Sequence, residues 1–141
     1  MKKLLPILLI MLTTLWACDE KENITLNNTI KEFIEQKYAG ARILYTEQEF
    51  NGDIEVEIIH DNIRKEVKFN RNNKWINTIW DISINQLPDA VKESIKNNYP
   101  EYLIDDADYI ETPSGDYYKV EIEKGEWDKT ILVTTKGEIL N

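Results

Sequence analysis

The sequence contains one cysteine, Cys18, and one histidine, His60. A single cysteine cannot form an intramolecular disulfide, and these two residues are too few for a Cys/His metal site. A Ser-His-Asp triad is also excluded, because we interpret His60 as an exposed residue of a hairpin turn. The five glycines form no glycine-rich phosphate-binding loop. We therefore predict no catalytic residue, no metal site and no cofactor.

Positive charge is also scarce. The chain has 17 basic and 26 acidic residues, which gives a formal net charge of −9. An acidic body argues against binding to nucleic acid or to an anionic lipid surface, since both require clustered lysine and arginine. Disorder is excluded as well, because 42% hydrophobic residues, with seven tyrosines and four tryptophans, can build a core.

The longest apolar run, residues 4–15, is too short to cross a membrane, which needs about 20 apolar residues. It follows Lys2 and Lys3, and this arrangement is typical of a secretory signal peptide. We expect residues 1–17 to be removed on export. The chain would then contain one compact domain or two small ones.

The residues around Cys18, Leu-Trp-Ala-Cys, resemble the bacterial lipobox, with Trp16 in place of the usual small residue. This resemblance implies cleavage before Cys18 and attachment of lipid to its thiol. Residues 18–25 would form a polar tether, and the membrane would be contacted only through the anchor. The alternative is an ordinary secretory signal, which would leave Cys18 as a free thiol.

The acidic residues after Cys18 suggest a location in the cell envelope. They resemble the surface-export signal of Bacteroidota lipoproteins, although Asp19 also resembles the inner-membrane retention signal of enterobacteria. The Asn-, Ile- and Lys-rich composition favours the first. We expect an outer-membrane lipoprotein that faces either the periplasm or the cell surface.

Two similar phrases lie 61 residues apart, one at residues 26–40 and one at residues 87–100. Their apolar residues recur at helical spacing, so each phrase predicts an amphipathic helix. Pro88 suits the first turn of the second helix, and Gly40 provides a left-handed stop after the first. Five aligned pairs are identical: Leu26/Leu87, Lys31/Lys92, Glu32/Glu93, Ile34/Ile95 and Tyr38/Tyr99.

After each helix the apolar period changes to two, which is typical of antiparallel strands with one buried face. The alternation covers residues 54–58 and 63–69 in the first half, and residues 118–123 and 127–133 in the second. We therefore predict an α+β fold of two tandem repeats, residues 26–84 and 85–141. Each repeat would be one helix packed on an antiparallel sheet of about four strands.

The second half reads Leu-Pro-x-x-Val-x-x-x-Ile-x-x-x-Tyr-Pro from Leu87 to Pro100, followed by an acidic-aliphatic hairpin. This pattern resembles the PepSY-like family, also called β-lactamase-inhibitor-like periplasmic proteins. The first half lacks both prolines, having Asn27 and Ala39 instead. The resemblance implies helices packed on antiparallel sheet and an envelope binding or inhibitory module, and it transfers no catalytic residue.

Two groups of carboxylates could bind a metal ion or take part in catalysis. Asp105, Asp106 and Asp108 could offer oxygens to calcium, but the glycine and distal glutamate of an EF-hand loop are missing. Four strand glutamates could act as the acid and base of a glycosidase. We assign them instead to cross-strand charge pairs with Arg64, Lys68, Lys119 and Lys129. The glutamates are Glu55, Glu57, Glu121 and Glu123.

The aromatic residues are the remaining signal. We expect most of them in the core, including Trp127 and Tyr118, which share the face of their aliphatic strand neighbours. Tyr117 and Leu132 fall on the opposite face beside Lys119, and an apolar pair among charges is typical of a partner site.

We therefore predict a non-enzymatic, lipid-anchored envelope module that binds an envelope protein or a protease through Tyr117, Lys119 and Leu132. The alternative is a small-ligand or calcium-binding envelope protein that uses Asp105, Asp106 and Asp108.

Overall fold

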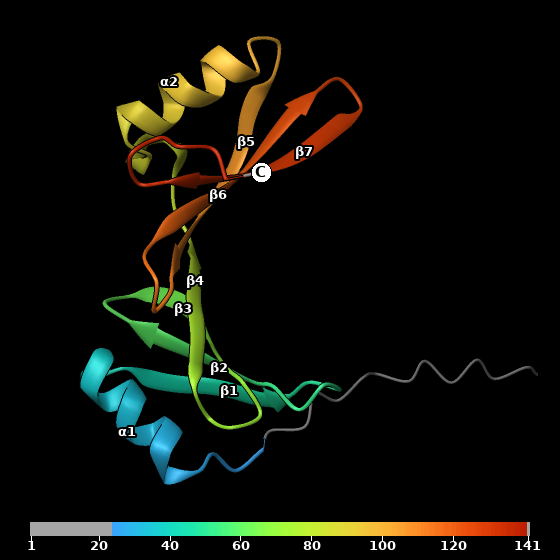
Figure 1. Ribbon diagram of the computed structural model, residues 1–141. Helices are drawn as coiled ribbons and strands as arrows, with labels where there is room; N and C mark the ends of the chain where they lie inside the picture. The colour runs from blue at the N-terminus through green and yellow to red at the C-terminus, as the bar shows by residue number, and fades with distance from the viewer. Residues whose placement is uncertain (1–23, 141) are drawn as a thin grey trace, which may run out of the picture.

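The computed structural model describes residues 24–140. The predicted signal peptide, Cys18 and most of the tether lie outside these residues. The described chain is an α+β fold with two helices, one 3-10 turn and a single antiparallel sheet in the strand order β1-β2-β3-β4-β5-β6-β7 (Figure 1). The elements are α1 Asn28–Lys37, β1 Arg42–Gln48, β2 Ile54–His60, β3 Ile63–Phe69, β4 Trp75–Asp81, η1 Ile84–Gln86, α2 Asp89–Asn98, β5 Leu103–Glu111, β6 Tyr117–Lys124 and β7 Trp127–Thr134.

Both predicted helices are present and have ten residues each. The side chain of Asn27 caps α1 by accepting a hydrogen bond from the backbone N–H of Ile30 at 3.0 Å. Pro88 stands at the N-cap of α2, one position before the first turn. Gly40 has φ +79, the left-handed conformation that was predicted for it. Among residues 24–140, no helix is long and apolar enough to span a membrane.

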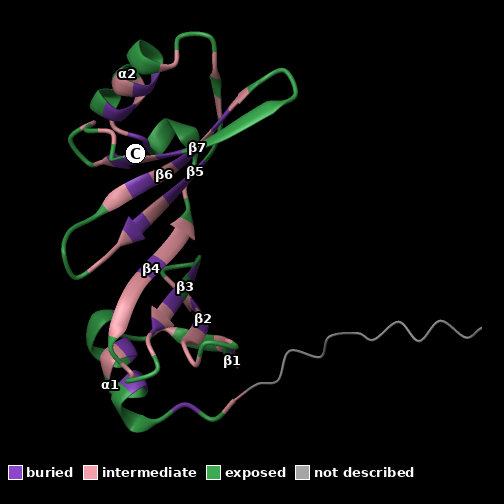
Figure 2. Ribbon diagram, turned by 45° about the vertical axis from the view of Figure 1, so that its right-hand side comes forward, coloured by how far each residue is buried: buried purple, intermediate pink, exposed green. Residues whose placement is uncertain are grey.

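Each helix covers its own hydrophobic cluster on one face of the sheet (Figures 1 and 2). The α1 cluster is Leu26, Ile30, Ile34, Tyr38, Val56, Ile58, Val67 and Phe69. The α2 cluster is Leu87, Val91, Ile95, Ala107, Tyr118, Val120, Ile122, Ile131 and Val133. Both helices lie on the same side of the sheet, so no helix of residues 24–140 covers the other side, which we call the helix-free face. Every residue of both clusters lies between 26 and 133, so a chain that starts at residue 19 keeps the whole core.

The two halves share one continuous sheet, because β4 pairs with β5 from Thr78↔Glu111 to Asp81↔Asp108. The prediction of about four strands per half was correct for the first half only. In the second half the chain after β7 forms an isolated bridge, Val133↔Ile139, in place of a fourth strand.

A chain of polar contacts crosses from the first half to the second. The Trp75 indole N–H donates to the Thr78 hydroxyl at 3.0 Å, and the hydroxyls of Thr78 and Tyr38 are 2.7 Å apart. Tyr38 donates to the Glu111 carboxylate at 2.6 Å, and Lys37 lies 3.4 Å from the same carboxylate. Thr78 is completely buried, so these hydrogen bonds replace the water that its hydroxyl loses on folding.

Four positions differ from the sequence prediction. Trp127 is 75% exposed, because the outer part of the β6–β7 hairpin extends beyond the α2 cluster. His60 ends β2 instead of lying in the turn, and its ring packs edge-on against Tyr38 at 5.5 Å. Lys65 takes an inward position in β3, where its ammonium lies 3.9 Å from the centre of the Trp80 ring. Ile63, which was expected to point inward, is 40% exposed.

Candidate functional site

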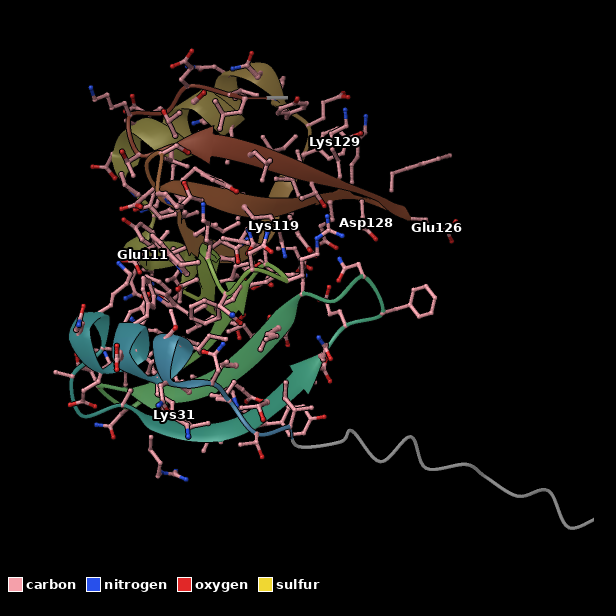
Figure 3. The ribbon with its side chains drawn as sticks, turned by 60° about the horizontal axis from the view of Figure 1, so that its bottom comes forward. Lys31, Glu111, Lys119, Glu126, Asp128 and Lys129 are labelled. Carbon is pink, nitrogen blue, oxygen red and sulfur yellow. The ribbon has the colours of Figure 1, made fainter. Side chains whose placement is uncertain are left out.

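The register of the sheet places a row of four side chains across the helix-free face. Asp81 on β4 faces Asp108 on β5, Asp108 faces Lys119 on β6, and Lys119 faces Leu132 on β7. Directly opposed residues share one face of a sheet, so these four side chains are neighbours. We call the three charged members, Asp81, Asp108 and Lys119, the charged row. Figure 3 labels Lys119, which projects from β6.

An apolar row runs beside it. Ile79 faces Ile110, and Ile110 faces Tyr117. Ile110 is only 4% exposed although neither α1 nor α2 covers this face, and Tyr117 is half-buried. The predicted residues Tyr117, Lys119 and Leu132 therefore do lie together on the helix-free face. Their role in binding a partner remains a prediction.

Asp108 is the electrostatic centre of the charged row. It is 5% exposed, and its carboxylate is 2.5 Å from the Lys119 ammonium. This hydrogen bond raises the pKa of Lys119, so the ammonium stays charged over the physiological range. On the other side of Asp108, its side chain raises the pKa of Asp81 by hydrogen bonding, with burial and the charges of Asp106 and Glu66 adding to the effect. The Lys119 ammonium also lies 3.8 Å from the Glu121 carboxylate, so it contacts two carboxylates.

The rows border a cleft with a volume of about 310 Å³. Its lining holds four carboxylates but only two cations, and both cations are already paired. Lys119 binds Asp108, and Arg64 forms an ion pair with Glu57 outside the lining. The cleft is thus acidic. Its lining residues are Arg64, Glu66, Ile79, Trp80, Asp81, Asp106, Asp108 and Lys119.

The three aspartates of the predicted calcium site are not brought together. A β-bulge between Ile104 and Asp106 leaves Asp105 as the extra residue of β5, and Asp105 does not line the cleft. Asp108 is already paired with Lys119. Within residues 24–140, no group of three or more His, Cys, Asp or Glu side chains is arranged to hold a metal ion.

Three of the four strand glutamates have basic neighbours, as expected, whereas Glu123 faces Asp128. Glu57 pairs with Arg64, Glu55 faces Lys68, and Glu121 lies 3.8 Å from Lys119. Lys129 is the exception, since its ammonium lies 5.2 Å from the centre of the Tyr99 ring on the helix side. Burial and the neighbouring Glu66 raise the pKa of Glu55.

Sequence reasoning missed Asp81, Glu66 and Ile79, which complete the cleft from the first half. The pairing of β4 with β5 brings them beside Asp108, and a 3-10 turn and α2 separate the two strands in the chain. The acidic residue that ends β4 was the available signal, but no local pattern specifies its cross-strand partner.

Comparison with solved structures gives the same fold. A BLIP-like protein from Bacteroides fragilis has 25% identity and a TM-score of 0.72, over 84% of this chain and 85% of that chain. A DUF2874 family protein from Bacteroides ovatus has 18% identity and a TM-score of 0.72, over 84% and 87%. A structure from Bacteroides eggerthii, described as "putative periplasmic proteins", has 16% identity and a TM-score of 0.69, over 84% and 88%.

No curated protein matches the sequence. The sequence profile of one family, described as "Putative beta-lactamase-inhibitor-like, PepSY-like", matches residues 52–141 as a single segment. This segment holds α2 and six of the seven strands, and with them every residue of the cleft. The chain belongs to the PepSY-like, β-lactamase-inhibitor-like family.

Proposed function

We propose that this protein is a non-enzymatic binding module of the cell envelope that inhibits or regulates an envelope protein or a protease. The observation that carries this proposal is the acidic cleft on the helix-free face. A lysine or arginine side chain of the partner would pair with the carboxylates of the cleft that lack a cation. The apolar row beside it would supply the contact area that favours association.

Two further observations support a binding role. One solved relative is described as BLIP-like, and the family is described as beta-lactamase-inhibitor-like. The helix-free face also presents half-buried aliphatic and aromatic groups next to charges, and neither α1 nor α2 covers them. We extend the inhibitory role from the names of these relatives to this chain as a hypothesis.

The test uses residues 19–141 as bait in an envelope extract, with chemical crosslinking and identification of the captured protein. The paired change Glu66→Gln and Asp106→Asn removes two exposed cleft carboxylates without touching the buried Asp108. The matched control, Glu126→Gln and Glu138→Gln, removes two exposed carboxylates outside the cleft. We expect the dissociation constant of the captured partner to rise about tenfold in the first variant, which corresponds to about 1.4 kcal/mol, and to stay constant in the second. Equal capture by both variants would refute the cleft as the binding site.

We further propose that Cys18 carries the lipid anchor and that the protein resides in the outer membrane. Relatives described as periplasmic support an envelope location. Metabolic labelling with a clickable fatty acid should mark the wild type and not Cys18→Ser. Equal labelling of both would exclude Cys18 as the attachment site.

We also propose that the two halves are copies of one unit, as the sequence predicts. Both helices end at a tyrosine of nearly identical backbone conformation, φ −128 and ψ 58 at Tyr38 and φ −132 and ψ 60 at Tyr99. The β-bulges that follow are separated by the same 61 residues, one after Ile43 and one after Ile104. Equivalent bulges in both halves support duplication, because bulges are specific features of a strand.

A further inference from the structure

A second concavity lies in the α2 half, between α2, η1 and the start of β5. It has a volume of about 540 Å³, within the range of small-molecule sites, which is about 300–1,000 Å³. Figure 1 shows α2 and the first part of β5 at the end of the molecule away from α1. We call this concavity the α2 groove. It is separate from the acidic cleft, and no residue lines both.

The groove is mainly aliphatic. Ile95, at 2% exposure, belongs to the α2 cluster, and Ile104 packs against that cluster. Leu103 is 71% exposed and Ile84 is 37% exposed. Exposed aliphatic side chains that continue a buried core offer apolar area to a ligand with little rearrangement of the protein.

Two lysines provide the charge of the groove. Lys92 and Lys96 are four residues apart on α2, so they stand on one face of the helix, and no carboxylate lines the groove. Lys92 has only a long contact of 3.8 Å to Asp89, whose side chain is 94% exposed. Among the ion pairs that residues 24–140 form, none involves Lys96. In a protein of net charge −9, a groove whose only charged lining groups are two ammonium groups is an exception that favours an anion.

We propose that the α2 groove binds a long-chain aliphatic carboxylate, of the fatty-acid type. The alkyl chain would lie along Ile84, Leu103 and Ile104, and the carboxylate would pair with Lys92 and Lys96. An amphiphile fits better than a peptide segment, because the lining offers few hydrogen-bonding groups and a peptide would bring backbone N–H and C=O groups that lose water. The observation behind the proposal is the combination of exposed aliphatic walls with two cations on one side.

The probe is dodecanoate, added below its micellar concentration to residues 19–141 and followed by calorimetry and by NMR shifts of backbone amides. Dodecanol has the same chain without the charge, and dodecylammonium has the opposite charge. We expect saturable one-to-one binding of dodecanoate, with amide shifts around residues 92–104. Binding of dodecanol should be at least tenfold weaker, and dodecylammonium should not bind.

Variants separate charge from apolar contact. The paired change Lys92→Gln and Lys96→Gln should weaken dodecanoate about tenfold and leave dodecanol unchanged, whereas Leu103→Ser should weaken both. The control, Lys31→Gln and Lys74→Gln, removes two exposed lysines of the first half, one of them on α1 (Figure 3), and should change nothing. The proposal is overturned if the three amphiphiles bind equally, if the control variant loses as much affinity, or if dodecanoate fails while an acidic aliphatic peptide binds. Since the groove and the cleft share no residue, loss of cleft binding in the Glu66→Gln, Asp106→Asn variant should leave dodecanoate binding intact.

Discussion

Replacing Tyr38 by phenylalanine tests the contact chain that joins the two halves. The change keeps the buried ring and removes only the hydroxyl, which donates to Glu111 at 2.6 Å and lies 2.7 Å from the Thr78 hydroxyl. A hydrogen bond to a charged group contributes about 1.5–3 kcal/mol, and one between neutral groups contributes about 0.5–1.5 kcal/mol.

The low ends of these ranges apply here. Glu111 is partly exposed and keeps Lys37 at 3.4 Å, so water and the ammonium can replace part of the lost bond. Thr78 still accepts from the Trp75 indole at 3.0 Å. We therefore expect a loss of about 2 kcal/mol in the free energy of unfolding, and a fall in Tm of roughly 8 °C for a domain of this size.

Urea unfolding followed by tryptophan fluorescence measures the loss, with Tyr99→Phe as the matched control. Tyr99 ends α2 just as Tyr38 ends α1, but its described side-chain contacts are ring contacts with Tyr102 and Lys129. The control should stay within about 0.5 kcal/mol of the wild type. A loss of less than 0.5 kcal/mol in Tyr38→Phe, or an equal loss in both variants, would refute the reasoning.

The same residue predicts a pH dependence. Burial and the bond to Glu111 raise the pKa of Tyr38 above its ordinary value near 10. The folded state therefore holds the phenolic proton more tightly than the unfolded chain does. This contribution to stability is complete below about pH 10 and is lost progressively above it, so the difference between wild type and Tyr38→Phe should shrink in alkaline solution.

Three further changes have definite expected outcomes. Asp81→Asn should stabilise the protein at pH 7, because the raised pKa of the Asp81 carboxyl means that the folded state disfavours its ionised form. The gain should stay below about 1 kcal/mol, since Asp81 is exposed. It should vanish below about pH 4, where the carboxyl is protonated in both states, and a constant gain across pH would contradict this account. Gly137→Ala should cost at least about 2 kcal/mol in thermal unfolding, because a Cβ there would lie 2.5 Å from the Ala90 carbonyl oxygen at φ +89, whereas Gly40→Ala, with open space around it, should cost only about 1 kcal/mol. Trp127→Ala should leave the free energy of unfolding within about 0.5 kcal/mol of the wild type, and a larger loss would show that the exposed indole packs against something.

The features that were predicted correctly are those encoded locally. The spacing of Ile30 and Ile34, and of Val91 and Ile95, specifies both helices, and the alternation along β2, β3 and β6 specifies their buried faces. Tyr117, Lys119 and Leu132 were placed on the correct face for the same reason, since a period of two fixes the side of each strand residue.

The features that were missed depend on tertiary contacts. Trp127 follows the inward alternation of β7, but the hairpin continues past the region that α2 covers. The same face of the strand is therefore exposed to solvent at Trp127. Figure 3 labels Glu126 and Asp128 at the outer end of this hairpin. Lys65 breaks the apolar pattern of β3, and its inward position depends on the Trp80 ring of the next strand. Asp81 enters the cleft only through the pairing of β4 with β5.

The pairing of β4 with β5 has a consequence for how the molecule can be divided. Asp81, Glu66 and Ile79 come from the first half, while Asp106, Asp108 and Lys119 come from the second, so neither half contains the whole cleft. A chain cut between residues 84 and 85 would yield two fragments that each carry part of the lining, and mixing them would restore the cleft only if the fragments reassociated through β4 and β5. Fragment complementation would therefore report directly on the strength of this junction.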